Sequence, residues 1–152
     1  MRSRRSRPCT SRTIEKVLYH ESGLKGLSGV SSDMRELLAS GSERAKLAID
    51  FYTYRIAQDV GKLAVVLGGL DGLVFTGGIG EHAAPIRAQV CERLAPVFGT
   101  VIDQQANEVG SSNGNERVSS RESRVPVFAI RTDEEGMIAL HTARLLRAAL
   151  RH

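Results

Sequence analysis

One short stretch of the sequence joins the pattern of a buried strand to a cluster of glycines. Residues 73–82 read LVFTGGIGEH, so that four apolar or β-favouring residues run directly into three glycines, an acid and a histidine. Glycines let backbone amides come close to the oxygens of a phosphate group. They also serve tight turns, because glycine adopts positive φ without steric cost. The stretch is therefore either a phosphate- or nucleotide-binding loop or a simple strand-to-helix turn.

The same glycines also fit a dinucleotide-binding fingerprint. Gly78, Gly80 and Ala83 match the pattern G-x-G-x-x-G/A, and Asp103 follows at about the 20-residue distance of a ribose-binding acid. Glu81 argues against this interpretation, because its carboxylate would repel a neighbouring pyrophosphate unless a metal ion lay between them. A dinucleotide-binding fragment of an oxidoreductase is therefore the less favoured alternative.

Composition and charge exclude several classes of partner. The chain has 152 residues, 41% of them hydrophobic, and a formal net charge of +4. Five of the 21 basic residues lie within the first twelve positions, so the remainder carries 16 basic and 17 acidic residues. A nucleic-acid-binding domain normally has a basic face on its folded part, and no apolar run approaches the ~18 residues of a membrane span. We therefore expect neither a nucleic-acid nor a membrane partner.

The ends and cysteines of the chain support a simple organisation. Residues 1–12 are basic and lack an apolar core, so they are predicted to be a disordered or non-native segment before a single portion over residues 13–150. Cys9 and Cys91 have no metal-ligand spacing and form no disulfide framework, which favours a cytoplasmic location. Cys91 lies on an apolar helix face and is expected to be a buried hydrophobic residue.

The periodicity of apolar residues predicts an α/β fold. Helices are expected over residues 13–20, 32–40, 42–67 and 85–96, and another helix begins at the acids of residues 132–135. Strands are expected at 72–76, 99–103 and 124–130, and the glycine-rich residues 22–31 and the polar residues 107–123 are predicted to be loops. This order predicts a partly parallel sheet flanked by helices, with few strands for an independent domain.

Five blocks of sequence, in order along the chain, resemble the C-terminal part of acetate kinase and its propionate kinase relatives. They are SGLKGLSGVSSDMREL, GGLDGLVFTGGIGEH, IRAQVCERL, ID followed shortly by AN, and SRVPVFAIRTDEEGMIA. The resemblance covers residues 13–146, almost the whole chain. It implies the C-terminal half of an actin-like ATPase fold rather than a dinucleotide-binding fold, so the chain is expected to be a C-terminal portion of the kinase.

The resemblance also implies the residues that bind ATP or ADP and Mg²⁺. The matching segment of Asp33, Met34 and Arg35 lies along the adenosine in the family, and the matching glycine loop passes the ribose and phosphates; its residues here are Gly77, Gly78, Ile79, Gly80 and Glu81. The acid that matches Glu134 helps to hold Mg²⁺. Local chemistry leaves simpler roles open, because Asp33 could only cap a helix and Glu134 could only favour a helix start. His82, Arg131 and Asp133 depart from the usual Asn, Pro and Asn of the family.

The activity implied is the reversible transfer of the γ-phosphoryl group of ATP to acetate or propionate, which yields an acyl phosphate. In the family the arginines and histidines that neutralise the transferring group, and the acyl pocket, belong to sequence N-terminal to the matched part. No catalytic residue is therefore assigned in this chain, and weak or no turnover is expected from it alone. The family is homodimeric, so a homodimer is expected. The alternative from a different class is a non-enzymatic nucleotide-binding or interaction module.

Overall fold

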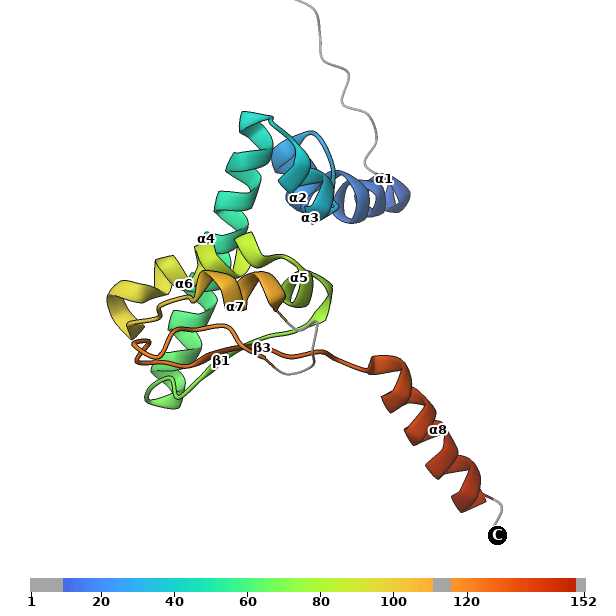
Figure 1. The fold of residues 1–152 in the computed structure, drawn as a ribbon. Helices are drawn as coiled ribbons and strands as arrows, with labels where there is room; N and C mark the ends of the chain where they lie inside the picture. The colour runs from blue at the N-terminus through green and yellow to red at the C-terminus, as the bar shows by residue number, and fades with distance from the viewer. Residues whose placement is uncertain (1–9, 111–115, 150–152) are drawn as a thin grey trace, which may run out of the picture. The chain divides into compact units, whose positions relative to one another are not determined.

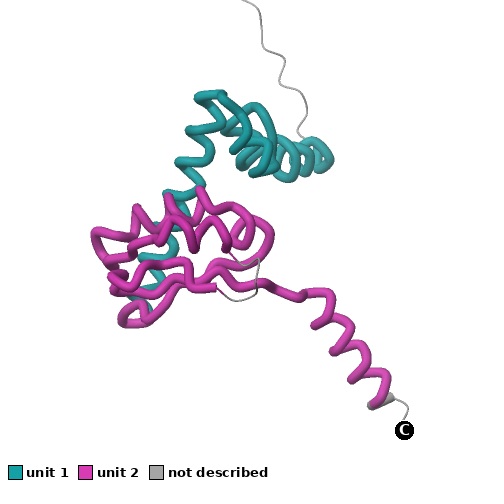
Figure 2. The backbone as a smooth tube through the Cα atoms, viewed as in Figure 1, with its two compact units in different colours: residues 1–66 teal, residues 67–152 magenta. Residues whose placement is uncertain are grey.

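The computed structural model describes residues 10–110 and 116–149 and divides the chain into two compact units, Met1–Val66 and Leu67–His152 (Figure 2). Of the expected N-terminal segment over residues 1–12, the first nine residues lie outside the described part. Ser11 and Arg12 already belong to a helix, which Thr10 caps by accepting a hydrogen bond from the Thr13 amide.

The first unit is helical. The helix α1 (Ser11–Lys16) continues into a π-helical turn, η1 (Val17–Glu21), and is followed by α2 (Gly23–Ser28), α3 (Met34–Ala39) and most of α4 (Glu43–Leu67) (Figure 1). The prediction of a loop over residues 22–31 is wrong, because α2 forms there. Gly29 ends this helix in the left-handed conformation, at φ 67°, and its amide donates to the Lys25 carbonyl.

The second unit contains a small sheet with the strand order β1-β3-β2. The strands β1 (Leu73–Phe75) and β3 (Val127–Ala129) are parallel, with Leu73 opposite Val127, and β2 (Glu116–Arg117) pairs antiparallel with β3. Val127 and Ala129 are completely buried. The predicted partly parallel sheet is confirmed, and its two parallel strands end at the same edge.

Three helices of this unit gather on one side of the sheet: α5 (Gly77–His82), α6 (Ala84–Phe98) and α7 (Gln104–Val109) (Figure 1). The helix α6 buries Ile86, Val90 and Leu94, which recur every four residues and so share one face. Cys91 is buried beside them, as predicted, and burial raises the pKa of its thiol to about 12.

Two predictions in this region are wrong. Pro96 does not end α6, which continues to Phe98. A proline in the last turn removes only one backbone hydrogen bond, and Gly99, at φ 64°, supplies the C-cap. The strand expected at 99–103 is reduced to one bridge between Ile102 and Ser119, and Asp103 caps the unpredicted helix α7 by accepting from the Ala106 amide. Asp103 therefore does not end a strand, as a ribose-binding acid of the fingerprint would.

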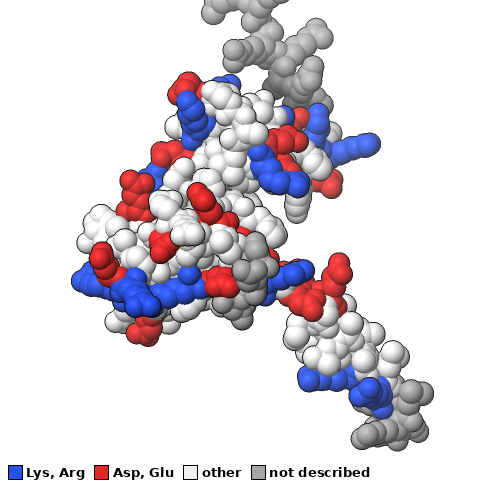
Figure 3. Space-filling view, in the orientation of Figure 1, with Lys and Arg blue, Asp and Glu red and all other residues white. Residues whose placement is uncertain are grey.

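The last helix, α8 (Glu134–Ala149), is amphipathic and exposed along its described side chains, residues 134–147. Ile138, Thr142 and Leu145 share a face, as the sequence predicts, but that face is open to solvent. Acidic side chains lie at the start of α8 and basic ones toward its end, which complements the helix dipole (Figure 3). On the face shown in Figure 3, acidic side chains lie among the basic ones on both units. Within the described residues, no helix is long and apolar enough to cross a membrane.

Candidate functional site

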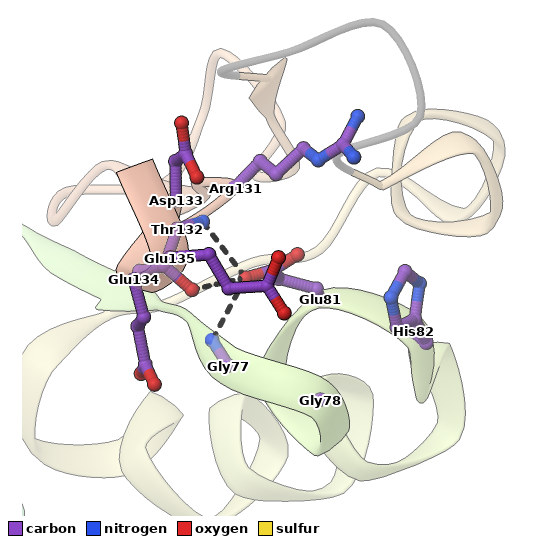
Figure 4. A pocket seen from close by; sticks show the side chains of 9 residues that line it. All are labelled: Gly77, Gly78, Glu81, His82, Arg131, Thr132, Asp133, Glu134 and Glu135. Atoms are coloured by element: carbon purple, nitrogen blue, oxygen red, sulfur yellow. Dashed lines mark hydrogen bonds between the residues drawn. The ribbon is translucent and has the colours of Figure 1, made fainter. Parts of the chain in front are cut away.

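A pocket of about 460 Å³ lies where the turn after β1 meets the segment between β3 and α8 (Figure 4). It forms because β1 and β3 are parallel neighbours, so that the segments after them emerge at the same edge of the sheet. Its lining residues are Gly77, Gly78, Glu81, His82, Arg131, Thr132, Asp133, Glu134 and Glu135. The two sequence segments singled out for phosphate and metal binding thus line one pocket.

Glu81 joins the two sides of this pocket. Its Oε1 atom accepts hydrogen bonds from the Gly77 amide at 3.0 Å, the Thr132 amide at 3.0 Å and the Thr132 hydroxyl at 2.9 Å (Figure 4). The residue is 8% exposed. These hydrogen bonds, above all that from the Thr132 amide, lower the pKa of the Glu81 carboxyl. Because the carboxylate is engaged by the protein itself, it fastens the turn to the β3–α8 segment.

The glycines of the turn have different steric reasons for lacking a side chain. Gly77 has φ 72°, a conformation that other residues adopt only with strain. A Cβ on Gly80 would lie 3.2 Å from the carbonyl carbon of Phe75, so this glycine allows α5 to pack closely on β1. Gly78 is exposed, has no positive φ, and a Cβ there would meet nothing within 4 Å. The fold therefore explains the glycines at 77 and 80 but places no steric demand on the one at 78.

The segment before α8 supplies the carboxylates of the pocket. Asp133 accepts a hydrogen bond from the Gly136 amide at 2.9 Å and so acts locally as the cap of α8. Glu134 lines the pocket, and in Figure 4 its side chain extends away from Glu81. Among the described residues, no group of three or more His, Cys, Asp or Glu side chains is arranged to hold a metal ion. Mg²⁺ usually takes one or two carboxylates and completes its shell with water or phosphate, and Glu134 and Glu135 offer carboxylates of this kind in the pocket lining.

The remaining predicted residues lie in the first unit. Asp33 is the N-cap of α3 and accepts from the Arg35 amide at 2.8 Å, while its second oxygen pairs with the Arg35 guanidinium at 2.7 Å. The hydrogen bonds from the Arg35 side chain lower the pKa of Asp33 to about 2. Met34 is 4% exposed and belongs to the core. The capping role that local chemistry left open for Asp33 is therefore present, and the pocket described above draws on residues of the second unit only.

Sequence reasoning missed the role of Thr132. It lies 51 positions after Glu81, and no local pattern links the two. The parallel pairing of the strands before them was the signal available, because it brings the following residues to one edge. Ile79 and Gly80, although predicted with the turn, do not line the pocket.

Known proteins resemble this chain over most of its length. A model of the acetokinase family matches residues 4–140. The acetate kinase of Rhodopseudomonas palustris strain CGA009 is 54% identical over 136 residues, which cover 90% of this chain and 33% of that protein. Among solved structures, acetate kinase from Porphyromonas gingivalis is 40% identical, with a TM-score of 0.76, and the match covers 91% of this chain and 35% of that one. A propionate kinase from Francisella tularensis is 39% identical, with a TM-score of 0.74, and the match covers 86% of this chain and 33% of that one. The chain thus spans about a third of the relatives it matches.

We predict that Glu81→Gln makes the stability less dependent on pH. A lowered carboxyl pKa in the folded state stabilises the protein above the ordinary pKa of 4.5, and this contribution is lost as the pH falls through the folded value. The free energy of unfolding from urea titrations should therefore differ most between wild type and variant at pH 7. The difference should begin to narrow near pH 4.5 and close as the pH falls below the lower folded-state pKa.

Glu92→Gln removes one charge from an exposed position on α6 and is the matched control for the overall change in charge. A difference between wild type and Glu81→Gln that stays constant from neutral to acidic pH would show that the Glu81 carboxylate does not have the role described.

Proposed function

The chain belongs to the acetokinase family, and on that premise we propose that it carries the nucleotide side of an acetate kinase. Residues 77–81 would bind the phosphates of ATP or ADP, and Glu134 would help to hold Mg²⁺ as part of the nucleotide complex. The reaction served is the reversible transfer of the γ-phosphoryl group to acetate or propionate. The similar solved structures include both an acetate kinase and a propionate kinase, so we propose a short carboxylic acid of this class, acetate or propionate, as the acceptor.

Gly78 carries the proposal. It lines the pocket, it is exposed, and neither its backbone conformation nor its surroundings require a glycine. Glycine is the default residue where a ligand comes close to the main chain. Gly41 and Gly61 have the same steric freedom, but of these three glycines only Gly78 lines the pocket. The Gly77 amide already donates to Glu81, so the contacts to phosphate fall to the rest of the turn.

The residues of the pocket fit Mg²⁺ as part of a nucleotide complex. Mg²⁺ is usually bound through one or two carboxylates together with water and substrate phosphates rather than by a complete protein cage. Glu134 and Glu135 are the carboxylates at the start of α8 that line the pocket. When bound, the ion would neutralise charge on the phosphates. The chain's own part is to hold the turn, the phosphates and a carboxylate in fixed positions.

The same proposal includes the finer features that the family resemblance implies. Asp33, Met34 and Arg35 lie along the adenosine, where the Arg35 guanidinium, 90% exposed at its side chain, offers a planar surface to a base. The protein acts in the cytoplasm as a homodimer. These features rest on family membership and on the exposure of Arg35.

We predict that Gly78→Ala weakens the binding of Mg-ADP without loss of stability. Alanine is a better helix former than glycine and would meet no atom here, so the unfolding midpoint should stay the same or rise slightly. Its methyl group would stand between the main chain and the phosphates, and the dissociation constant measured by calorimetry should increase about tenfold or more, which is about 1.4 kcal/mol.

Gly41→Ala is the matched control, because Gly41 also has open space and no positive φ. Its affinity for Mg-ADP should equal that of the wild type. Unchanged affinity in Gly78→Ala, together with measurable binding by the wild type, would refute the placement of phosphates at this turn.

The 152-residue chain alone is expected to show weak or no phosphoryl transfer. It spans about a third of its relatives, and the resemblance places the catalytic arginines and histidines and the acyl pocket in the other part. Calorimetry should therefore detect binding of Mg-ADP, while a coupled assay should detect no acetate-dependent consumption of ATP. Normal acetate-dependent turnover by the purified chain would contradict this division of roles.

A further inference from the structure

Arg87 is a buried cation whose hydrogen-bond partners among the described residues are all neutral. It lies on α6, one turn after the start of the helix, and is 1% exposed. Its Nε donates to Asn107 Oδ1 at 2.7 Å, its Nη1 donates to the carbonyls of Gly80 and Glu81, both at 2.8 Å, and its Nη2 donates to the Asn107 carbonyl. Four of the five N–H donors of the guanidinium are thus engaged by the protein.

The burial of this charge has an energetic cost, which the four hydrogen bonds of the guanidinium offset in part. A charged group removed from water is strongly destabilising unless its donors are satisfied. Burial lowers the pKa of Arg87, yet a guanidinium stays protonated in proteins. An apolar side chain would avoid the cost of the charge, but it would leave the carbonyls of Gly80 and Glu81 without this donor.

The two carbonyls belong to the turn that lines the pocket. They lie near the C-terminal end of α5, where carbonyl groups lack partners within the helix. Glu81 is thereby held twice, at its side chain by Gly77 and Thr132 and at its main chain by Arg87.

The helix α7 completes the support around Arg87. The Nδ2 atom of Asn107, which is 2% exposed, donates to the Ala84 carbonyl at the start of α6. Gly110, at φ 57°, passes so close that a Cβ there would lie 2.9 Å from Arg87 Nη2 and 3.1 Å from the Glu81 carbonyl oxygen. The turn therefore rests on a polar cluster whose members come from α6 and α7.

We propose that Arg87, supported by Asn107, is a positioning residue that fixes the main chain of residues 77–82 for the nucleotide without contacting it. The expected effect of Arg87 on nucleotide binding rests on the proposed function, whereas its hydrogen bonds to the carbonyls of Gly80 and Glu81 do not depend on that function. It assigns a role to the block IRAQVCERL, which contains Arg87 and which the nucleotide and metal contacts leave unexplained.

The test compares Arg87→Met and Arg87→Lys with Val90→Ala in the full chain. Val90 is buried one turn away on the same helix, so its truncation weakens packing but removes no hydrogen bond to residues 77–82. Each protein is studied at the same interval below its own unfolding midpoint, so that global stability is matched. Hydrogen–deuterium exchange of residues 77–82 and the dissociation constant of Mg-ADP are measured for each.

We expect exchange at residues 77–82 to accelerate about tenfold in Arg87→Met and less in Arg87→Lys, because an ammonium group cannot span all these acceptors. The dissociation constant should rise in the same order, while Val90→Ala matches the wild type in both measurements. If Arg87→Met does not fold, Arg87→Lys provides the comparison.

Exchange that is unchanged in the Arg87 variants, or equally accelerated in Val90→Ala, would overturn the inference. A wild type that binds no Mg-ADP would instead contradict the proposed function, and the exchange measurement would still decide whether Arg87 fixes the turn.

Discussion

Glu81 Oε1 accepts three hydrogen bonds from two segments that lie 51 positions apart, and the arrangement of the pocket depends on them. The parallel pairing of β1 and β3 brings the ends of two strands to one edge, but it does not fix the residues that follow them. The carboxylate does so, because it binds the amide that opens the glycine turn and the amide and hydroxyl just before α8. A charged acceptor forms stronger hydrogen bonds than a neutral one, which suits a contact between segments far apart in the sequence.

Two side chains of opposite charge hold the main chain of residues 77–82 in place from opposite sides. Glu81 holds the pocket side through its carboxylate, and Arg87 holds the buried side through the Gly80 and Glu81 carbonyls. Neither side chain needs to touch a ligand to matter for binding, because a phosphate site made of backbone groups is only as well ordered as the main chain that forms it. Under the proposed function, the unobstructed Gly78 is the point where the phosphates come close to the main chain.

The sequence predicted the parts of the fold that have strong local signals. The apolar runs of β1 and β3, the long helices α4 and α6, and the acidic start of α8 were all found in this way. The six-residue helices α2 and α7 were missed, since helices this short depend on packing rather than on intrinsic propensity and their sequences are rich in polar residues and glycine. The prediction that Pro96 ends α6 was wrong because a proline in the last turn of a helix costs little stability.

The pocket brings together some of the residues singled out from the sequence, but the sequence did not indicate what each of them contacts. The family resemblance pointed to residues 77–81 and Glu134, and the pocket contains Gly77, Gly78, Glu81 and Glu134. Glu81 was considered only for its charge near a phosphate, because a sequence cannot show that a carboxylate is turned toward Thr132. From the sequence, Arg87 could be singled out only as a member of the block IRAQVCERL. Its role depends on burial and on contacts to α7, which arise from tertiary structure alone.

The most direct measurement is an amide-resolved NMR titration of the isotope-labelled chain with ADP, in the presence and absence of Mg²⁺. If residues 77–81 and 134 form one nucleotide–metal site, the amides of residues 78–80 and 133–135 should shift together, and the shifts of 133–135 should require Mg²⁺. Shifts centred on residues 103–109, or shifts at the turn without a Mg²⁺-dependent response before α8, would contradict a shared site.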